Sequence, residues 1–262
     1  MIVSLLKSGT KAVLPRGPRQ KLKNWLKAFL WDTVGTDIRL ALADQFIRGT
    51  GIEIGALNRP LPVGKQAQVR FVDRLTVADA RRQYPELNGL PLVEPDILTD
   101  GETLAGFADR SQDFVIANHF VEHTQDPIGT LQNIARVLKP GGVLFMGLPD
   151  KRYTFDVHRP ETPFEHLLHD HTAGPEGSRL GHYEEWVRLV EGLTAPEQVR
   201  VRTNELADMG YSIHFHVWTP VGAHQFVERT FKRIAIPYEL LTMTLNPESS
   251  EMIFILRIGT AA

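Results

Sequence analysis

At 262 residues, 42% of them hydrophobic and 23% charged, the chain can form one large domain with a sizeable core. A formal net charge of −2 gives no general attraction to nucleic acid, so no partner of that class is predicted. The absence of cysteine excludes disulfides and thiolate chemistry. This absence and the lack of any apolar run of roughly 18 residues favour a cytoplasmic protein.

The first 48 residues are predicted to form a helical extension. Residues 1–31 carry seven basic side chains and no acid, and Leu22, Trp25 and Phe29 fall on one helical face. Such a helix could lie on an anionic membrane, as in a membrane-peripheral protein. The favoured interpretation is packing on the protein body or on a second subunit. A second helix is predicted over residues 37–48.

The next hundred residues alternate between apolar strands and amphipathic helices. Strands are predicted near 51–55, 68–73, 91–97, 113–118 and 143–148, and helices near 76–84 and 127–138. A helix near 220–232 precedes a predicted antiparallel hairpin of strands at 236–243 and 252–257. The alternation indicates a mostly parallel α/β sheet with helices on both faces. The domain is predicted over 49–262, with residues 150–218 as an insertion that covers the substrate.

Polar side chains end the first five predicted strands, and these residues are Glu53, Asp73, Asp96, Asn118 and Asp150. Ligands of such sheets bind at the carboxyl ends of the strands. Gly55 permits a sharp turn after the first strand, and Asp73 follows about 20 residues later. This spacing is typical of an α/β sheet that holds the ribose of a nucleotide-like cofactor.

These motifs resemble those of class I S-adenosylmethionine-dependent methyltransferases, over about residues 48–148 and 211–258. The matching sequences are Glu-Ile-Gly at 53–55, Val-Asp-Arg at 72–74, Asp-Ile at 96–97, Asp-Phe-Val-Ile-Ala-Asn-His-Phe-Val-Glu-His at 113–123, Asp-Pro at 126–127 and Arg-Val-Leu-Lys-Pro-Gly-Gly-Val at 136–143. The resemblance implies a Rossmann-like class I sheet whose last strand is antiparallel.

The resemblance also implies S-adenosyl-L-methionine as the cofactor, with nine contact residues. Glu53, Gly55 and Ala56 would approach the methionine moiety, Asp73 the ribose, and Arg74, Asp96 and Ile97 the adenine, while Asn118 and His119 would lie near the sulfonium. One departure concerns the first loop, where Leu57 and Arg59 stand at positions that the family usually fills with glycine. Bulky side chains there would narrow the approach to the cofactor.

Seven of the ten histidines lie between residues 150 and 218. Residues 149–171 look like a branch of methyltransferases often found beside glycosyltransferases in polysaccharide-biosynthesis clusters, which implies O-methylation of a glycan or another small hydroxylated acceptor. A hydroxyl needs a base, or a metal that lowers its pKa, before it can attack. The candidates for a catalytic base or a divalent-metal ligand are His123, Asp156, His158, His166, Asp170 and His171.

Two other functions remain open at this stage. A nicotinamide-dependent oxidoreductase could use the same sheet and acids, although Pro60 and Pro62 oppose the helix start that its pyrophosphate needs. A non-catalytic cofactor-binding subunit of a glycan-assembly complex would suit the altered glycine loop and the basic N-terminus. Binding of S-adenosylmethionine rather than NAD would separate the methyltransferase from the oxidoreductase.

Overall fold

The computed structural model describes residues 38–246 and 250–259. The predicted basic helix within residues 1–31 lies outside these ranges. Residues 38–46 are helical, within the second predicted helix. The labelled strands and helices, including short 3₁₀ turns (η), are β1 Gly49–Ile54, β2 Ala67–Asp73, α2 Val77–Gln83, η2 Pro85–Leu87, β3 Ile97–Leu98, β4 Gln112–Asn118, η3 Val121–His123, α3 Pro127–Val137, β5 Leu138–Pro149, η4 Lys151–Tyr153, η5 Phe155–His158, α4 Phe164–Ala173, α5 Glu176–Leu189, α6 Pro196–Met209, α7 Pro220–Ile234, β6 Tyr238–Asn246 and β7 Glu251–Ile258.

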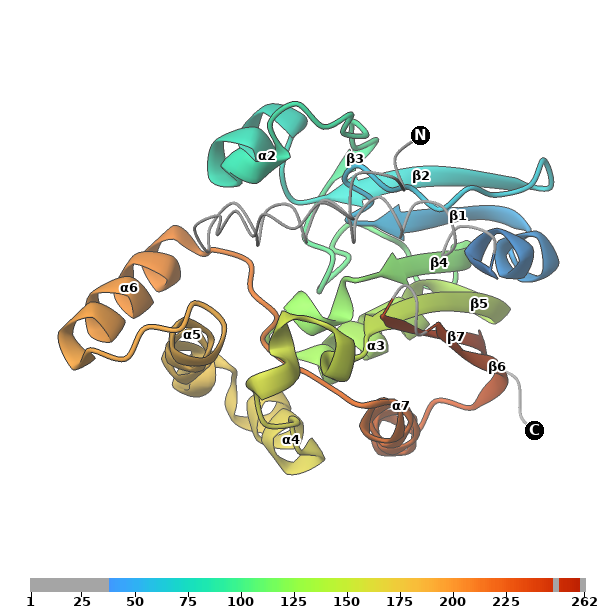
Figure 1. Ribbon diagram of the computed structural model, residues 1–262. Helices are drawn as coiled ribbons and strands as arrows, with labels where there is room; N and C mark the ends of the chain where they lie inside the picture. Colours follow the sequence, from blue (N-terminus) through green and yellow to red (C-terminus); the bar gives the residue numbers. More distant parts are fainter. Residues whose placement is uncertain (1–37, 247–249, 260–262) are drawn as a thin grey trace, which may run out of the picture.

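A seven-stranded sheet in the order β3-β2-β1-β4-β5-β7-β6 forms the centre of the molecule (Figure 1). Strands β1 to β5 pair in parallel, whereas β7 pairs antiparallel with both β5 and β6. The strand order reverses between β1 and β4, which is where doubly wound sheets bind their ligands. The predicted fold class, a mostly parallel class I methyltransferase sheet with a reversed last strand, is confirmed.

Alternate side chains of the central strands enter two different hydrophobic cores. Phe114 and Ile116 of β4 pack on one face with the helix over 38–46. Val115 and Ala117 point to the other face, which helices α3 and α7 cover. All four side chains are fully buried. Burial of a large apolar side chain stabilises a fold by about 1.5–3 kcal/mol, so the sheet is held mainly by this apolar layer.

Local hydrogen bonds fix the helix starts that the sequence predicts. The Thr76 hydroxyl accepts a hydrogen bond from the amide of Asp79, which caps α2. The Asp126 carboxylate accepts one from the amide of Gly129 at 2.8 Å and caps α3. Pro127 at the first position of α3 has no amide hydrogen to leave unpaired.

The third strand differs from its prediction. It covers only Ile97 and Leu98, so Asp96 precedes the strand and does not end it. The Asp96 carboxylate accepts a hydrogen bond from the amide of Phe71 at 2.7 Å, and the Asp96 amide donates one to the carbonyl of Phe71. Pro95, which has no amide hydrogen, limits pairing just before this point. The acid that follows β3 is Asp100.

Residues 150–218 form a helical insertion with α4, α5, α6 and the return segment 211–218. Helices α5 and α6 lie beyond the carboxyl ends of the strands, away from the sheet (Figure 1). Their small apolar cluster is centred on Tyr183, Val187, Leu206, Ile213 and Phe215. No helix among the described residues is long and apolar enough to cross a membrane.

Candidate active site

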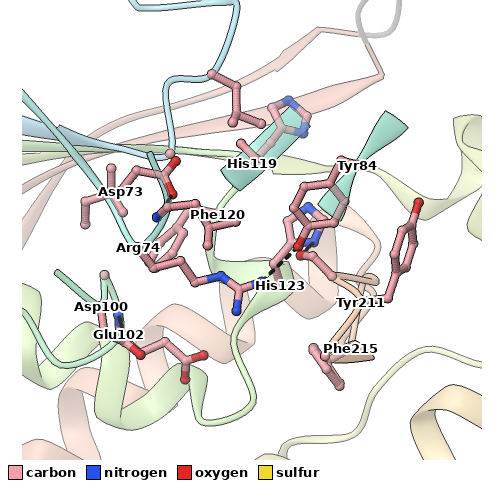
Figure 2. Close-up of a pocket in the computed structure, with 18 of the residues that line it drawn as sticks. Asp73, Arg74, Tyr84, Asp100, Glu102, His119, Phe120, His123, Tyr211 and Phe215 are labelled. Carbon is pink, nitrogen blue, oxygen red and sulfur yellow. Dashed lines mark hydrogen bonds between the residues drawn. The ribbon is translucent and has the colours of Figure 1, made fainter. Parts of the chain in front are cut away.

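A cavity of about 450 Å³ lies between the carboxyl ends of the strands and the insertion (Figure 2). Its lining comes from the ends of β1 and β2 and the segments that follow β1, β2, β3 and β4, from α2 and η2, and from α5 and the return segment. The lining residues are Ile54, Gly55, Leu57, Asp73, Arg74, Leu75, Ala80, Tyr84, Glu86, Leu87, Asp100, Gly101, Glu102, His119, Phe120, His123, Gln125, Arg179, Tyr183, Gly210, Tyr211, Ser212 and Phe215. This volume falls in the usual range for small-molecule sites.

The loop after β1 opens the cavity on the sheet side. Gly55 has φ +66°, and a Cβ atom there would meet only Phe120, at 4.0 Å. Leu57 also has a positive φ, 49°, which a leucine rarely adopts. The loop therefore keeps a backbone suited to glycine even though a leucine stands there, at a cost on the order of 1 kcal/mol.

Asp73 ends β2 and lines the cavity. One of its carboxylate oxygens accepts a hydrogen bond from the amide of Leu75 at 3.0 Å. Burial raises the pKa of Asp73 above its ordinary value, against the lowering effect of the backbone hydrogen bonds from Leu75 and Arg74. A half-buried acid at this position is suited to accept hydrogen bonds from ligand hydroxyls.

The side chain of Arg74 extends across the cavity to the far wall (Figure 2). Its guanidinium donates to the hydroxyl of Tyr84 at 2.8 Å. The ring of Tyr84 packs edge-on against Tyr211, with centroids 5.4 Å apart, and the Tyr211 hydroxyl donates to Glu86 at 2.8 Å. Residues after β2 and residues of the insertion thus close the cavity together.

Asp100 and Glu102 supply acids that the sequence prediction missed. Both follow β3 and line the cavity. Burial, with the nearby charge of Asp100, raises the pKa of Glu102 to about 7. The sequence Thr-Asp-Gly at 99–101 is a turn signal that could have placed the strand end at Asp100.

Five of the nine predicted cofactor residues do not line the cavity: Glu53, Ala56, Asp96, Ile97 and Asn118. Glu53 lies beneath the loop, where both carboxylate oxygens accept from the amide of Leu61 at 2.9 and 3.0 Å. Burial raises the pKa of Glu53 to about 7. Glu53 therefore holds the loop and does not face the cavity. The other four, Gly55, Asp73, Arg74 and His119, do line it.

His119 occupies the end of β4 with φ +50° and lies between two carboxylates. Its Nε2 is 3.2 Å from Glu251 and its Nδ1 is 3.4 Å from Glu122. Burial lowers the pKa of His119, but the hydrogen bonds and charges of Glu122 and Glu251 outweigh this effect and raise it to about 9. His119 is consequently protonated at neutral pH, which places a positive charge beside the cavity.

His123 lies on the opposite side of the cavity from Asp73 (Figure 2). Its Nδ1 is 2.9 Å from the carbonyl of Ile213 and 3.0 Å from the hydroxyl of Ser212. Burial and the nearby His214 lower the pKa of His123 to about 4. If Nδ1 donates to the carbonyl, Nε2 of the neutral ring has a free lone pair.

A buried polar network continues behind His123. The ring of His123 packs edge-on against that of His214, with centroids 4.7 Å apart, and Nδ1 of His214 is 2.7 Å from the carboxylate of Asp156. Arg159 donates to Asp156 at 2.9 Å and to Glu185 at 2.7 Å. Removing one partner of an ion pair so deeply buried strongly destabilises a protein, because the other charge stays buried without compensation.

The six predicted catalytic residues do not form one cluster. Of the six, only His123 lines the cavity. Asp156 belongs to the network behind it, and His158 is exposed. His166 and Asp170 lie together elsewhere in the insertion, 3.2 Å apart. His171 pairs with Asp126 at the start of α3, at 3.0 Å.

Comparison with known proteins agrees with the sheet topology. Residues 48–146 match a family described as a methyltransferase domain. No curated protein sequence matches the chain. A protein from Rhodobacter sphaeroides described as a Zn-dependent alcohol dehydrogenase is 12% identical, with 88% of this chain and 98% of that chain covered and a TM-score of 0.51. A methyltransferase from Aquifex aeolicus is 14% identical, with 86% and 89% covered and a TM-score of 0.45.

A third similar structure is a methyltransferase from Thermotoga maritima described as a possible histamine N-methyltransferase. It is 14% identical, with 92% of this chain and 97% of that chain covered and a TM-score of 0.45. At 12% identity and a TM-score of 0.51, the likeness to the Rhodobacter sphaeroides protein concerns the fold alone. The family match over residues 48–146 makes this part of the chain similar to a methyltransferase domain, and it falls within the parallel half of the seven-stranded sheet.

Proposed function

We propose that the protein transfers a methyl group from S-adenosylmethionine to a hydroxyl of a glycan or glycan precursor. The proposal is carried by one arrangement, a cavity with Asp73 on the sheet side and the neutral imidazole of His123 on the opposite side. Asp73 is suited to the ribose hydroxyls, and Asp100, which replaces Asp96 in this role, to the adenine amino group. The open space at Gly55 leaves room for the methionine moiety.

Methyl transfer to an oxygen needs alignment of the acceptor with the methyl group, exclusion of water and a base that accepts the hydroxyl proton. The bound cofactor supplies an electrophilic methyl group on its sulfonium. Residues of the insertion line one side of the cavity, and we infer that they help to align the acceptor for an in-line approach. We assign His123 as the base, because Nε2 can take the proton as the oxygen attacks. The buried Glu122 carboxylate nearby offsets part of the burial and of the His214 charge that disfavour the imidazolium and lower the pKa of His123.

The choice of a glycan rests on two features. Tyr211 and Phe215 of the insertion, with Tyr84 after α2, give the cavity aromatic faces on which sugar rings can pack. Arg179 adds a hydrogen-bond donor. The second feature is the expectation, drawn from the sequence alone, that residues 149–171 resemble methyltransferases of polysaccharide clusters.

Calorimetry and a methyl-transfer assay test the two halves of the proposal separately. The chain should bind S-adenosylhomocysteine and not NAD, and Asp73→Ala should weaken that binding by about 1–3 kcal/mol because ribose loses its acceptor. In an assay with sugar nucleotides and oligosaccharides, His123→Gln should lower turnover by about 10²–10⁴-fold and leave S-adenosylhomocysteine binding within threefold.

The exposed His158 offers a matched control, and His158→Gln should behave like the wild type. Unchanged affinity in a folded Asp73→Ala variant would exclude the ribose assignment. Unchanged turnover in His123→Gln would exclude the base. Transfer to amines but not to hydroxyls would overturn the acceptor class and leave the cofactor assignment intact.

A further inference from the structure

Three histidines and one aspartate meet inside the insertion, away from the cavity. His166 and Asp170 stand one turn apart on α4, so they share one face of that helix. His182 comes from α5 and His216 from the return segment that follows α6. None of these four residues lines the cavity. Three separate segments of the insertion therefore converge on one point.

The ring nitrogens of the three histidines are close enough to share one ion, and Asp170 lies beside two of them. Nε2 of His166 lies 3.0 Å from Nε2 of His182 and 3.2 Å from Oδ2 of Asp170. Nε2 of His182 lies 3.8 Å from the same carboxylate oxygen. One ring nitrogen from each of the three histidines falls within 4.8 Å of the others. Ligand atoms bound about 2.0–2.2 Å from a tetrahedral zinc have separations of this order.

Two atoms of the group are buried without a hydrogen-bond partner among the described residues. These atoms are Oδ2 of Asp170 and Nδ1 of His216. The Asp170 side chain is fully buried, and His216 is 0% exposed. An unsatisfied buried polar atom costs about 1–3 kcal/mol, and more when it is charged. A cation at this point would remove both penalties at once.

Hydrogen bonds from residues outside the group hold the side chains of Asp170 and His216 in place. The hydroxyl of Ser178 donates to Oδ1 of Asp170 at 2.8 Å, which leaves Oδ2 facing the histidines. Nε2 of His216 is 3.5 Å from the carbonyl of Gln125, so Nδ1, which has no partner among the described residues, is the nitrogen left for an ion. Metal-ligating side chains usually have such second partners, which fix the tautomer and the ring orientation.

We propose that His166, Asp170, His182 and His216 bind a Zn²⁺ ion. Three imidazole nitrogens and one carboxylate oxygen form a donor set that zinc accepts with tetrahedral geometry. The three histidines supply three ligands, and Oδ2 of Asp170, beside His166 and His182, is the candidate for the fourth. The site lies away from the cavity, so the role of the ion is structural. The ion joins α4, α5 and the return segment, which also carries the cavity residues Tyr211, Ser212 and Phe215.

A second histidine group, formed by Glu122, His123 and His214, is less suited to a metal. Its carboxylate, Glu122, already pairs with His119, whose Nδ1 is 3.4 Å away. His123 also faces the cavity, where the proposed methyl transfer gives it another role. The zinc proposal does not depend on that reaction, because its tests measure metal and not methyl transfer.

Metal content and affinity of the untagged full chain test the proposal. Elemental analysis after desalting should find one zinc per chain. After removal with a chelator, Zn²⁺ titrated against a chromophoric competitor should bind once, and Co²⁺ should give the intense visible absorption of a tetrahedral site that zinc then abolishes. Less than a tenth of an equivalent of zinc in the wild type, with no Co²⁺ absorption, would overturn the proposal.

Variants locate the ion. His166→Gln and Asp170→Asn should weaken zinc binding at least tenfold, whereas His169→Gln, on the exposed side of the same helix, should bind like the wild type. Glu122→Gln should also keep wild-type affinity. Zinc lost in Glu122→Gln but kept in His166→Gln would place the metal in the second group and refute this site. Far-UV circular dichroism checks that each variant folds. If a variant does not fold, the Co²⁺ spectrum of the wild type still tests whether the ion is bound with tetrahedral coordination.

Discussion

The sheet and the insertion are stabilised by different kinds of contact. In the sheet, fully buried apolar side chains from β4, β5 and β7 pack against helices on both faces. In the insertion the apolar cluster is small, and buried charges such as Asp156, Arg159 and Asp170 link its segments. Apolar burial depends little on pH or on metals, whereas buried charges depend on their partners. The scaffold should therefore survive treatments that loosen the cover of the cavity.

The largest effect on stability is expected from a substitution that leaves an empty space in the sheet core. Phe254 of β7 is fully buried in the core shared with α3 and α7. Phe254→Ala should lower the free energy of unfolding by about 3–5 kcal/mol, because transfer and cavity costs add. Urea unfolding followed by circular dichroism measures the change. Val221→Ala on the exposed surface of α7 is the control, and a loss below about 1 kcal/mol for Phe254→Ala would contradict this view of the core.

A smaller effect, confined to the insertion, is expected from Asp156→Asn. The substitution keeps the shape but removes the negative charge between Arg159 and His214. A hydrogen bond to a charged partner contributes about 1.5–3 kcal/mol. Limited proteolysis should cut within residues 150–218 faster, while the urea midpoint of the sheet moves little.

The control for that experiment is Glu197→Gln, which breaks an exposed ion pair with Arg200 on α6. Exposed pairs contribute little to stability, so proteolysis should proceed as in the wild type. If Asp156→Asn shifts the unfolding of the whole protein as strongly as it speeds cleavage, the two regions unfold as one unit and the contrast between them fails.

The smallest effect concerns pH. It arises from buried charges in the sheet, where the contrast with the insertion is incomplete. Arg39, His119 and Glu251 meet at the ends of β4 and β7. The pKa of His119 is raised to about 9, so its stabilisation is complete below about 6.5 and is lost as pH rises through 9. Hydrogen bonds to His119 and Arg39 outweigh burial and lower the pKa of Glu251 to about 2, so that stabilisation is lost as pH falls from about 4.5 to 2.

Thermal unfolding between pH 6 and 10 measures the alkaline part of this effect. His119→Gln should flatten the decline in melting temperature between pH 6.5 and 9, because glutamine does not titrate. A slope as steep as that of the wild type would show that other groups cause the decline.

The sheet could be predicted from the sequence because its signals are local. Apolar runs, the Thr76 and Asp126 caps and the hairpin turn each lie within a few residues of the element they define. The third strand was misplaced because its two residues give no apolar run and because the Asp96 side chain pairs with the β2 backbone. When a side chain replaces a backbone hydrogen bond between strands, the sequence shows no alternating pattern that would reveal it.

The insertion side of the site could not be predicted in this way. His166 and His171 appeared to belong to one cluster because they are near in sequence, but a helical turn directs them to different neighbours. His182 and His216 join His166 only through the packing of α5 and the return segment. Contacts between residues so far apart depend on the tertiary fold.

The pairing of β5 with β7 has a consequence for how fast the chain can fold. Pro149 at the end of β5 pairs with Glu251 at the start of β7, so the entire insertion and α7 must be accommodated before these strands meet. The entropic cost of closing a loop grows only with the logarithm of its length, about 0.6 kcal/mol for each doubling. Contacts between distant residues nevertheless slow folding. The parallel half of the sheet, β1 to β5, can therefore form first, and the reversed strand closes the structure last.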